Sequence, residues 1–531
     1  MPYSMLLSKA ARTAVGLSLK KSLVLVDEAH NLPEAIRTLH SSRLNLPVTE
    51  VALEQLTAYT QRYASRLTGR NLYYLGQIRK CLLAFIRYLK SGPSQSRKMM
   101  SSGELLIELK LDNVNIFKII RYLEHSRLPQ KLLGFTTVIL DASKELSSAP
   151  GENTLSKHVS ALSVVQGFLE KLTSTTKEGK VVTDWPAEVV DTDSRSRAIQ
   201  HPTLRFVLLH PAAHFQNVLD EAHGVALVGG TLKPFAHVAA ELLGIEHIQE
   251  AAKADNAFNK STSTTLETVS ETLTTFACDH VVPSSNIRLE CMTVGPTNQK
   301  LDFRHTSRTA NVVCDELGRA ILQVCMKVPS GMVVFLPSYS YETHLVRRWK
   351  ATGIWQDFLQ QKSVYREPKS SQQVEAVLDA YSRDAQSKGA ILLSVVGGKM
   401  SEGINFANDM ARCVMVVGLP YPDITDPELK EKMTNMDQNA SHFNCATTGQ
   451  AYYHNLCMRA VNQSVGRAIR HADDYAAIIL ADARYATDQR VWMGLPTWLR
   501  RDVCQSSKTF KAVGLSLDCF FGLKHSFTVS P

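Results

Sequence analysis

LVLVDEAH, residues 23–30, is the stretch from which the rest of this 531-residue sequence is best interpreted. Its first four residues are apolar, and the acids Asp27 and Glu28 follow directly. Such a short run predicts a buried strand that ends in a functional loop, with a helix from about residue 29 to 40. A strand end that presents two carboxylates is the form of a Walker B box, which faces a nucleotide-bound metal.

The residues of this box are candidates for separate catalytic tasks. Asp27 would hold Mg²⁺, directly or through water, and Glu28 would orient and deprotonate the water that attacks the γ-phosphate. His30, the last residue of DEAH, is a further catalytic candidate. By itself, a strand followed by two acids is also a common helix N-terminus, where carboxylates interact favourably with the helix dipole. The box therefore needs a partner motif.

The partner is Gln463-x-x-Gly466-Arg467-x-x-Arg470, within VNQSVGRAIRH. On a helix the two arginines would occupy neighbouring positions of one face. Paired guanidinium groups suit the spread charge of a transferring phosphoryl group. Four fixed positions, at about one in twenty each, occur by chance in a chain this long only about 0.003 times. A solvated basic helix face is the weaker alternative.

These two motifs resemble those of superfamily 2 helicases, and more narrowly those of the XPD-like DNA helicases. Three further segments match in the same order: VGGTLKP at 228–234 resembles motif III, VVFLPSY at 333–339 resembles motif IV, and GGKMSEGINF at 397–406 resembles motif V. The resemblance implies nucleotide coupling by Gly230, Thr231, Glu402, Gly403 and Gly466, and nucleic-acid contact by Ser338, Ser401 and Asn405.

One variant position narrows the resemblance to a branch. Asn405 stands where many XPD-like members have Asp, and with YPDITDPELKEKM it is most similar to the chromosome-loss, or DEAD/H-box helicase 11-like, branch. That branch is associated with sister-chromatid cohesion. The resemblance implies a nuclear 5′-to-3′ DNA helicase that uses ATP and Mg²⁺. Its expected partners are single-stranded or forked DNA, and cohesion or replication-fork proteins.

The domain organisation follows from the periodicity of the chain and from the resemblance. Residues 1–44 and 200–235 are expected to form the C-terminal part of a first RecA-like α/β domain with a parallel sheet. Residues 45–199 show apolar positions at three- and four-residue steps, which favours a mainly helical, arch-like insertion. Residues 236–531 are expected to form the second RecA-like domain, because helix-length stretches separate their apolar runs. A separate helical domain on a linker is the alternative for the insertion.

The positive charge of the chain is concentrated in one stretch. The chain has 59 basic and 50 acidic residues, a net charge of +9. Residues 61–100 contain nine basic residues and no acid, so the charge of this stretch equals the whole net charge of the chain. Arg62, Arg66 and Arg70 begin it, and interleaved aromatic residues would suit phosphate contact and base stacking on single-stranded DNA. For the aromatic residues, packing in the core is the favoured alternative.

The sequence contains no phosphate-binding loop of the form GxxxxGK[ST], whose amides and lysine hold the β- and γ-phosphates. In XPD-like helicases that loop, and four cysteines that ligate a [4Fe-4S] cluster, precede DEAH. Here 26 residues precede it and none is cysteine, so the sequence does not support the cluster. We expect negligible DNA-stimulated ATPase from these 531 residues. The first hypothesis is an N-terminally incomplete helicase, and the second is a short form that binds nucleic acid or regulates.

Two other classes of site are not expected. The ten cysteines include no CxxC pair of the kind that opens a zinc or redox motif. No apolar run approaches the length of a membrane span, so a membrane partner is not expected.

Overall fold

The computed structural model of the chain consists of two compact units. Unit 1 comprises residues 1–228, 240–244 and 425–435, and unit 2 comprises residues 229–239, 245–424 and 436–531. The structure describes residues 1–93, 96–135, 160–173, 179–186, 201–244, 247, 251, 255, 265–268, 273–278, 280, 282–400, 404, 406, 408–443, 448–500 and 509–528. Within this described part, no helix is both long and apolar enough to cross a bilayer.

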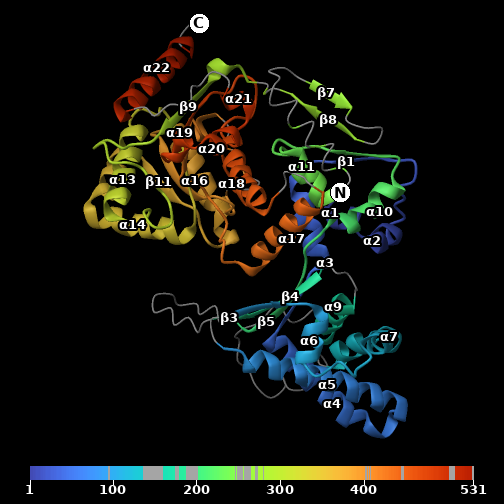
Figure 1. Cartoon of the computed structure of the whole chain (residues 1–531). Coiled ribbons are helices and arrows are strands. Elements are labelled where there is room, and N and C mark those ends of the chain that lie inside the picture. The colour runs from blue at the N-terminus through green and yellow to red at the C-terminus, as the bar shows by residue number, and fades with distance from the viewer. Residues whose placement is uncertain are drawn as a thin grey trace. The chain divides into compact units, whose positions relative to one another are not determined.

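A six-stranded sheet, parallel throughout, forms the centre of unit 2 (Figure 1). Its order is β11-β12-β10-β13-β14-β9. The strands are β9 Ile287–Met292, β10 Gly331–Leu336, β11 Ser363–Arg366, β12 Ala390–Val395, β13 Cys413–Val417 and β14 Ala476–Ala481. Every residue of β10, β12, β13 and β14 is buried, as expected for parallel strands covered on both faces. The apolar runs of the sequence predicted these four fully buried strands.

Helices cover both faces of this sheet. Alternate residues of β10 enter opposite hydrophobic clusters: Met332 and Val334 pack with α13 and α14, whereas Val333 and Phe335 pack with α16 and α18. The helices of unit 2 are α11 Phe235–Val238, α13 Asn311–Cys325, α14 Tyr339–Thr352, α15 Ile354–Gln361, α16 Val374–Gln386, α18 Gly449–Gly466, α19 Arg484–Thr487, α20 Gln489–Met493, α21 Thr497–Arg500 and α22 Phe510–Thr528. A small antiparallel pair, β7 Thr265–Thr268 and β8 Thr274–Ala277, completes the described elements.

Unit 1 contains the LVLV run as β1, Leu23–Val26, which pairs in parallel with β6, Gly224–Leu227. The expectation of a buried strand is only half right. Val24 and Val26 are buried, but Leu23 and Leu25 are 74% and 77% exposed. The reason is that this sheet has two strands, and one face of β1 is uncovered by the described residues. The nearby helices are α1 Tyr3–Leu7, α2 Lys9–Ala14, α3 Leu32–His40 and α10 Ala212–Glu221, with a 3₁₀ turn at Ala29–Asn31.

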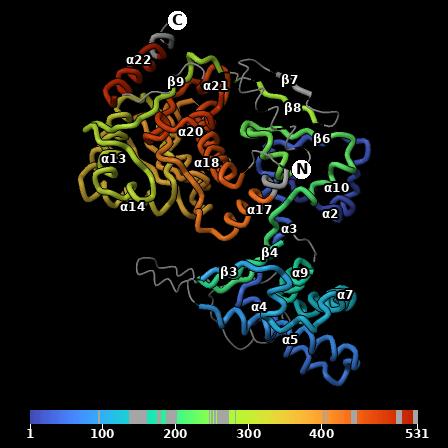
Figure 2. The backbone as a smooth tube through the Cα atoms, viewed as in Figure 1, coloured from blue at the N-terminus to red at the C-terminus, as the bar shows by residue number. Residues whose placement is uncertain are grey.

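The insertion contains helices and an antiparallel sheet, which Figure 2 shows beside one another. Its helices are α4 Leu46–Tyr63, α5 Gly69–Ser91, α6 Ser102–Glu108, α7 Ile116–Ser126 and α9 Ala161–Thr173, with a 3₁₀ turn at Ala64–Arg66. Its sheet has the order β2-β5-β4-β3, formed by β2 Ser42–Asn45, β3 Ser96–Met100, β4 Gly179–Trp185 and β5 Thr203–Leu208. The apolar positions that recur at three- and four-residue steps lie on α5, and all but one are buried: Leu75, Ile78, Leu82, Phe85 and Leu89 lie in the core, whereas Leu72 is 39% exposed.

Several boundaries of the predicted domains need correction. Residues 229–235, expected in the first RecA-like domain, belong to unit 2, and residues 240–244, expected in the second, belong to unit 1. Residues 203–208 were expected to resume the parallel sheet of the first RecA-like domain after residue 200, but β5 pairs antiparallel with β2 and β4. The β-rich run was recognisable, whereas its partners, which are distant along the chain, were not. The segment 425–435, expected in the second RecA-like domain of residues 236–531, belongs to unit 1.

Residues 425–435 contain the start of α17, Pro427–Phe443, and they pair with basic residues of the antiparallel sheet. Each of three strands contributes one cation. The ion pairs are Asp426 with Arg97 of β3 at 3.6 Å, Glu431 with Lys180 of β4 at 3.4 Å and Glu428 with Arg205 of β5 at 3.2 Å. This charge complementarity explains why the segment packs with the insertion.

Candidate functional site

The DEAH box lies at the carboxyl end of β1, where β6 fixes its backbone. The Val228 N–H donates to the Val26 carbonyl and the Ala29 N–H donates to the Val228 carbonyl, both at 2.9 Å. Between them, Glu28 adopts the left-handed conformation with φ 47° and ψ 43°. A non-glycine residue pays about 1–2 kcal/mol for this conformation. Such strain is typical of functional loops that the surrounding structure holds in place.

The carboxylates of the box are accessible. Both Asp27 and Glu28 are exposed, and Asp27 Oδ1 accepts the Glu28 N–H at 2.9 Å. The second oxygen of Asp27 accepts no hydrogen bond from the described residues. His30, with 10% of its side chain exposed, places Nδ1 3.3 Å from Glu28 Oε2. The structure therefore brings the three predicted residues of the box together at one strand end.

Tyr3 supports the box from a position that the sequence did not suggest. Its hydroxyl donates to the carbonyl oxygens of Asp27 and of Glu28, the latter at 3.1 Å. Burial, followed by the two carboxylates, raises the pKa of Tyr3, so the hydroxyl remains a donor. No spacing rule connects residue 3 to residue 27, and only the fold reveals this contact.

The fit of a metal to Asp27 can be judged from its donor atoms. Mg²⁺ prefers carboxylate and phosphate oxygens and is often held by one or two carboxylates together with the phosphates of a nucleotide. An exposed Asp27 with an uncommitted oxygen fits that role. Among the described residues there is no group of three or more His, Cys, Asp or Glu side chains that could bind a metal by itself. Asp27 would therefore hold a nucleotide-borne Mg²⁺, and the sequence lacks the usual phosphate-binding loop.

The motif III residues directly follow β6 along the chain and belong to unit 2. Gly230 is exposed, and a side chain there would meet no atom within 4 Å. The Thr231 hydroxyl is buried and has no hydrogen-bond partner within the described part of the chain. The coupling role of both residues stays a prediction.

The arginines of motif VI do not lie on a helix, which corrects the expectation from the sequence. Helix α18 contains Gln463 and ends at Gly466, and Arg467 is its C-cap. The Arg467 N–H donates to the Ser464 carbonyl at 3.3 Å, a three-residue bond that tightens the last turn. Glycine favours such an ending because it is a poor helix former. A side chain at Gly466 would meet no atom within 4 Å.

The two arginine side chains nevertheless converge. Arg467 Nη1 lies 3.3 Å, and Arg470 Nη2 3.5 Å, from the carbonyl oxygen of Ile404 in motif V. Motifs V and VI therefore contact each other within unit 2. The predicted residues Ser401, Glu402, Gly403 and Asn405 lie outside the described residues.

A buried acid, Asp474, holds the turn that carries these arginines. Its Oδ2 accepts the Arg470 N–H at 3.3 Å, and its Oδ1 accepts from Arg412 Nη1 at 2.9 Å. Arg412 also stacks over the Tyr475 ring at 4.0 Å. This support could not be predicted from the sequence, because Arg412 and Asp474 are far apart along the chain.

Motif IV lies where β10 passes into α14. The Ser338 hydroxyl caps α14 by accepting the Tyr341 N–H at 3.2 Å. Tyr339 donates its hydroxyl to Glu367 Oε1 at 2.6 Å. Burial, followed by this carboxylate, raises the pKa of Tyr339 to about 12. Ser338 thus has a structural role as a cap as well as its predicted nucleic-acid contact.

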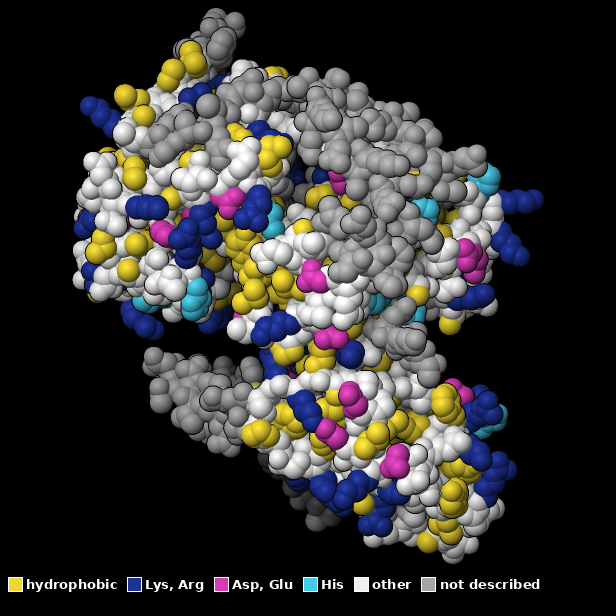
Figure 3. All heavy atoms as spheres, viewed as in Figure 1, with side chains coloured by type: hydrophobic (Ala, Val, Ile, Leu, Met, Phe, Trp, Pro, Cys, Tyr) yellow, Lys and Arg dark blue, Asp and Glu magenta, His cyan; other side chains and the backbone are white. Residues whose placement is uncertain are grey.

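The first part of the basic stretch is exposed on α4, α5 and the turn between them, whereas its last part is paired with acids: Lys90 with Glu50, Arg97 with Asp184 and Asp426, and Lys98 with Glu108. Figure 3 shows lysine and arginine side chains gathered over this part of unit 1. Arg62, Arg66 and Arg70 are exposed, and none forms an ion pair with a described residue. Arg62 lies 5.8 Å from the centre of the Phe135 ring. Unpaired guanidinium groups of this kind are available to phosphates.

Most of the interleaved aromatic residues pack instead of facing solvent, which confirms the favoured alternative. Phe85 is fully buried. Tyr74 stacks on Tyr122 at 4.6 Å, and Tyr88 lies 5.5 Å from Trp185, measured between ring centres. Tyr73, 62% exposed, remains accessible for base stacking.

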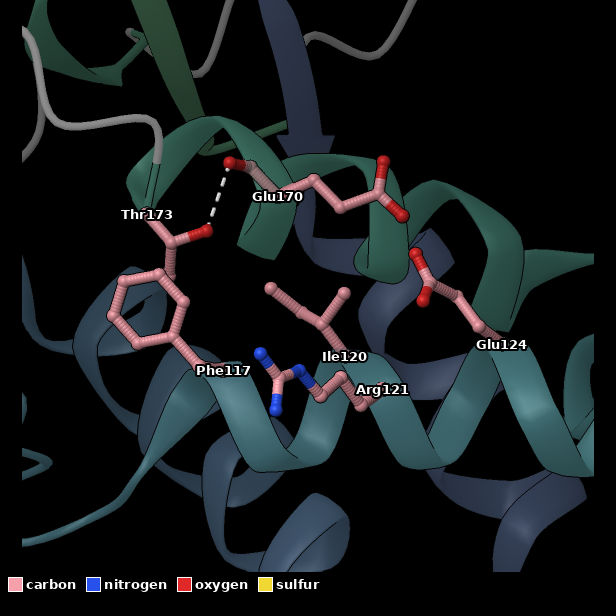
Figure 4. Close-up of a pocket in the computed structure, with 6 residues that line it drawn as sticks. All are labelled: Phe117, Ile120, Arg121, Glu124, Glu170 and Thr173. Carbon is pink, nitrogen blue, oxygen red and sulfur yellow. Dashed lines mark hydrogen bonds between the residues drawn. The ribbon is translucent and has the colours of Figure 1, made fainter.

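A hollow of about 320 Å³ lies between α7 and α9 (Figure 4). Its lining is Phe117, Ile120, Arg121, Glu124, Glu170 and Thr173. Figure 4 shows the Phe117 ring and the Arg121 guanidinium on the α7 side, with the Thr173 hydroxyl bonded to the Glu170 carbonyl. None of the motif residues reaches it, so we assign it no role in the site.

Two family models match the parts of the chain that carry the first and the last of these motifs. The model of the helicase C-terminal domain matches residues 321–502, and the DEAD_2 model matches residues 1–47. The ATP-dependent DNA helicase DDX11 of Danio rerio is 35% identical over 94% of this chain, which covers 58% of that protein. DDX11 of Mus musculus is 36% identical over 94% of the chain and 57% of that protein. CHL1 of Coccidioides immitis is 32% identical over the whole chain and 59% of that protein.

The chain therefore spans less than two thirds of the length of these relatives. Among solved structures, Xpd4 of S. tokodaii has a TM-score of 0.50 and 17% identity, over 93% of this chain and 80% of that one. An apo XPD structure has a TM-score of 0.50 and 14% identity, over 96% and 80%. At these identities the likeness supports the fold, with its RecA-like parallel sheet.

Proposed function

Because this chain belongs to the XPD-like DNA helicases of superfamily 2, together with relatives named DDX11 and CHL1, we propose that it carries out the work of an ATP-dependent 5′-to-3′ DNA helicase. The observation that best supports the proposal is the convergence of Arg467 and Arg470 on the Ile404 carbonyl of motif V. This arrangement links a phosphate-sensing pair to a segment that would contact nucleic acid. We further propose a nuclear protein that acts on single-stranded or forked DNA, in chromosome maintenance and cohesion, with cohesion or replication-fork proteins as partners.

In this proposal the residues have the following chemistry. Asp27 would hold the Mg²⁺ that accompanies ATP, Glu28 would take the proton of the attacking water, and His30 would orient Glu28. Arg467 and Arg470 would neutralise the charge that develops on the transferred phosphoryl group, and Gln463 would act together with them. Five residues couple the state of the nucleotide to the bound DNA strand: Gly230, Thr231, Glu402, Gly403 and Gly466. The DNA strand is contacted by Ser338, Ser401 and Asn405.

A second function is favoured by one specific observation, the absence of GxxxxGK[ST] from the sequence. Without that loop, the backbone amides and lysine that hold the β- and γ-phosphates are missing. The chain would then act as a nucleic-acid-binding or regulatory short form. Sequencing the transcript upstream of Met1 separates the two: an in-frame GKT or GKS loop supports an active helicase, and an upstream stop codon supports the short form.

We predict negligible DNA-stimulated ATPase for the 531-residue protein, because nothing in its sequence replaces the phosphate-binding loop. The measurement is phosphate release from Mg-ATP with and without single-stranded DNA. Glu28→Gln serves as the matched control, since it removes only the proposed base. Turnover in the unsubstituted protein that disappears in Glu28→Gln would contradict the prediction.

The basic stretch should bind the DNA backbone. Reversing Arg62, Arg66 and Arg70 to Glu should lower the affinity for single-stranded DNA. The slope of log K against log salt should fall by about 2, because each lost phosphate contact removes about 0.7. The measurement is fluorescence anisotropy across a salt series.

The control for this experiment carries the same change of charge at another surface. Arg347, Lys350 and Arg383 are exposed on α14 and α16 of unit 2, and their reversal to Glu changes the net charge equally. We expect the slope of this control to remain close to that of the unsubstituted protein. A slope unaffected by reversal of Arg62, Arg66 and Arg70 would exclude this surface from DNA binding.

A further inference from the structure

Glu367 occupies a central position at the carboxyl edge of the sheet in unit 2. It directly follows β11, and its N–H donates to the Leu393 carbonyl of β12 at 2.9 Å. Since β12 lies between β11 and β10, the side chain reaches toward the ends of both neighbours. It is 8% exposed, which is unusual for a carboxylate that has no cationic partner among the described residues.

The Glu367 carboxylate accepts four hydrogen bonds from three segments. Oε1 accepts from the Tyr339 hydroxyl of motif IV at 2.6 Å and from the Met400 N–H of motif V at 3.1 Å. Oε2 accepts from the Ser394 hydroxyl at 2.7 Å and from the Val395 N–H at 2.8 Å. Each oxygen thus receives two donors, which compensates for its removal from water.

The double glycine of motif V fits this carboxylate. Gly397 has φ 69°, a left-handed conformation that favours glycine. A Cβ at Gly398 would lie 2.3 Å from Glu367 Oε1, too close for any side chain. The first glycine therefore permits the turn and the second permits the approach of the motif V backbone to Glu367. The two glycines therefore allow the motif V backbone to contact the Glu367 carboxylate.

We propose that Glu367 is a positioning residue that fixes motif IV and motif V to each other. Through Tyr339 and Met400 it sets the arrangement of the motif IV backbone that carries Ser338 relative to the start of motif V, and so supports contact with a single strand. The consequence for DNA binding rests on the proposed function. The clamp itself is a property of the fold and can be tested separately. Tyr339 and Met400 lie in the segments that resemble motifs IV and V, whereas Glu367 and Ser394 were not singled out from the sequence.

The first test is hydrogen–deuterium exchange of the full chain. Tyr339→Phe removes one hydroxyl and should raise exchange in residues 395–400 about tenfold, the equivalent of one hydrogen bond to a charged group. Ser394→Ala is the matched control, because it removes the other hydroxyl from the same carboxylate. It should leave the exchange of the peptide around residue 339 unchanged. If Tyr339→Phe leaves residues 395–400 unchanged, the clamp is refuted.

The second test asks whether the clamp matters for DNA. Tyr339→Phe should weaken single-stranded DNA binding, whereas Ser394→Ala should not. Glu367→Gln leaves one acceptor oxygen for two pairs of donors, so it should have the larger effect. If Tyr339 acts through Glu367, adding Tyr339→Phe to Glu367→Gln should cause no further loss. A full additional loss would mean that Tyr339 contacts DNA by itself, and would overturn the positioning role.

The two tests separate the inference from the proposed function. If the unsubstituted protein does not bind single-stranded DNA, the proposed function fails, and the exchange experiment alone decides whether Glu367 joins the motifs. If DNA binding is present and all variants bind equally well, the proposed function stands and the role of Glu367 in binding is wrong.

Discussion

Replacing Glu241 with alanine should destabilise unit 1 by about 3–5 kcal/mol. Glu241 forms an ion pair with Arg37 of α3, and the two residues are 4% and 6% exposed. Removing the acid leaves a buried guanidinium group without its main counter-charge, a much larger penalty than the loss of a surface pair. Because α3 follows the DEAH box, the change should also loosen the helix on which the box depends.

Hydrogen exchange of peptides from α3 measures this loss directly. Glu34→Ala is the matched control: Glu34 lies 3.3 Å from the same arginine, but its side chain is 70% exposed. Removal of this solvated partner should cost less than about 1 kcal/mol. Equal effects of the two substitutions would show that Arg37 is solvated in solution. Replacing Arg37 and Glu241 together by Met and Leu should restore much of the stability.

Asp474→Ala should destabilise unit 2 by about 3 kcal/mol. The substitution removes the buried partner of Arg412 and the acceptor of the Arg470 N–H. We expect the lower end of the range for a broken buried pair, because Arg412 keeps a 3.1 Å bond to Asp409. The turn that carries Arg467 and Arg470 should lose its fixed conformation at the same time.

Urea unfolding followed by tryptophan fluorescence reports on this unit. Four of the five tryptophans belong to it: Trp349, Trp355, Trp492 and Trp498. Asp473 is the adjacent residue and is exposed, so Asp473→Ala should change the midpoint little. A midpoint that shifts equally in both variants would mean that Asp474 stabilises the turn only through its overall charge.

Local patterns predicted the second domain well. Apolar runs between helix-length stretches identified β10, β12, β13 and β14, because a parallel strand covered on both faces is apolar along most of its length. DEAH and the motif VI arginines were found from their spacing, and the structure places each set together. The helical face predicted for Arg467 and Arg470 was wrong, since spacing alone cannot show that α18 ends at Gly466.

The missed features all depend on pairing between distant parts of the chain. The sequence shows a β-rich run at 203–208, but its pairing with β2 and β4 is decided by which edges meet in three dimensions. Glu367 and Asp474 belong to no recognisable motif, and each acquires its role from donors on other segments. The acidic start of α17 lies in YPDITDPELKEKM, a segment that indicated only the family resemblance, and the basic strands that it pairs with explain its place in unit 1.

The uncovered face of β1 has a consequence for the behaviour of the protein in concentrated solution. Leu23 and Leu25 expose most of their side chains on a strand that has one partner strand among the described residues. Apolar side chains beside an unpaired strand edge promote aggregation of the protein. Strongly hydrated salts such as sulfate strengthen this attraction, whereas added salt weakens the hold of basic side chains on DNA. Dilute protein and modest ionic strength therefore favour both properties: the protein stays dispersed, and it remains bound to DNA.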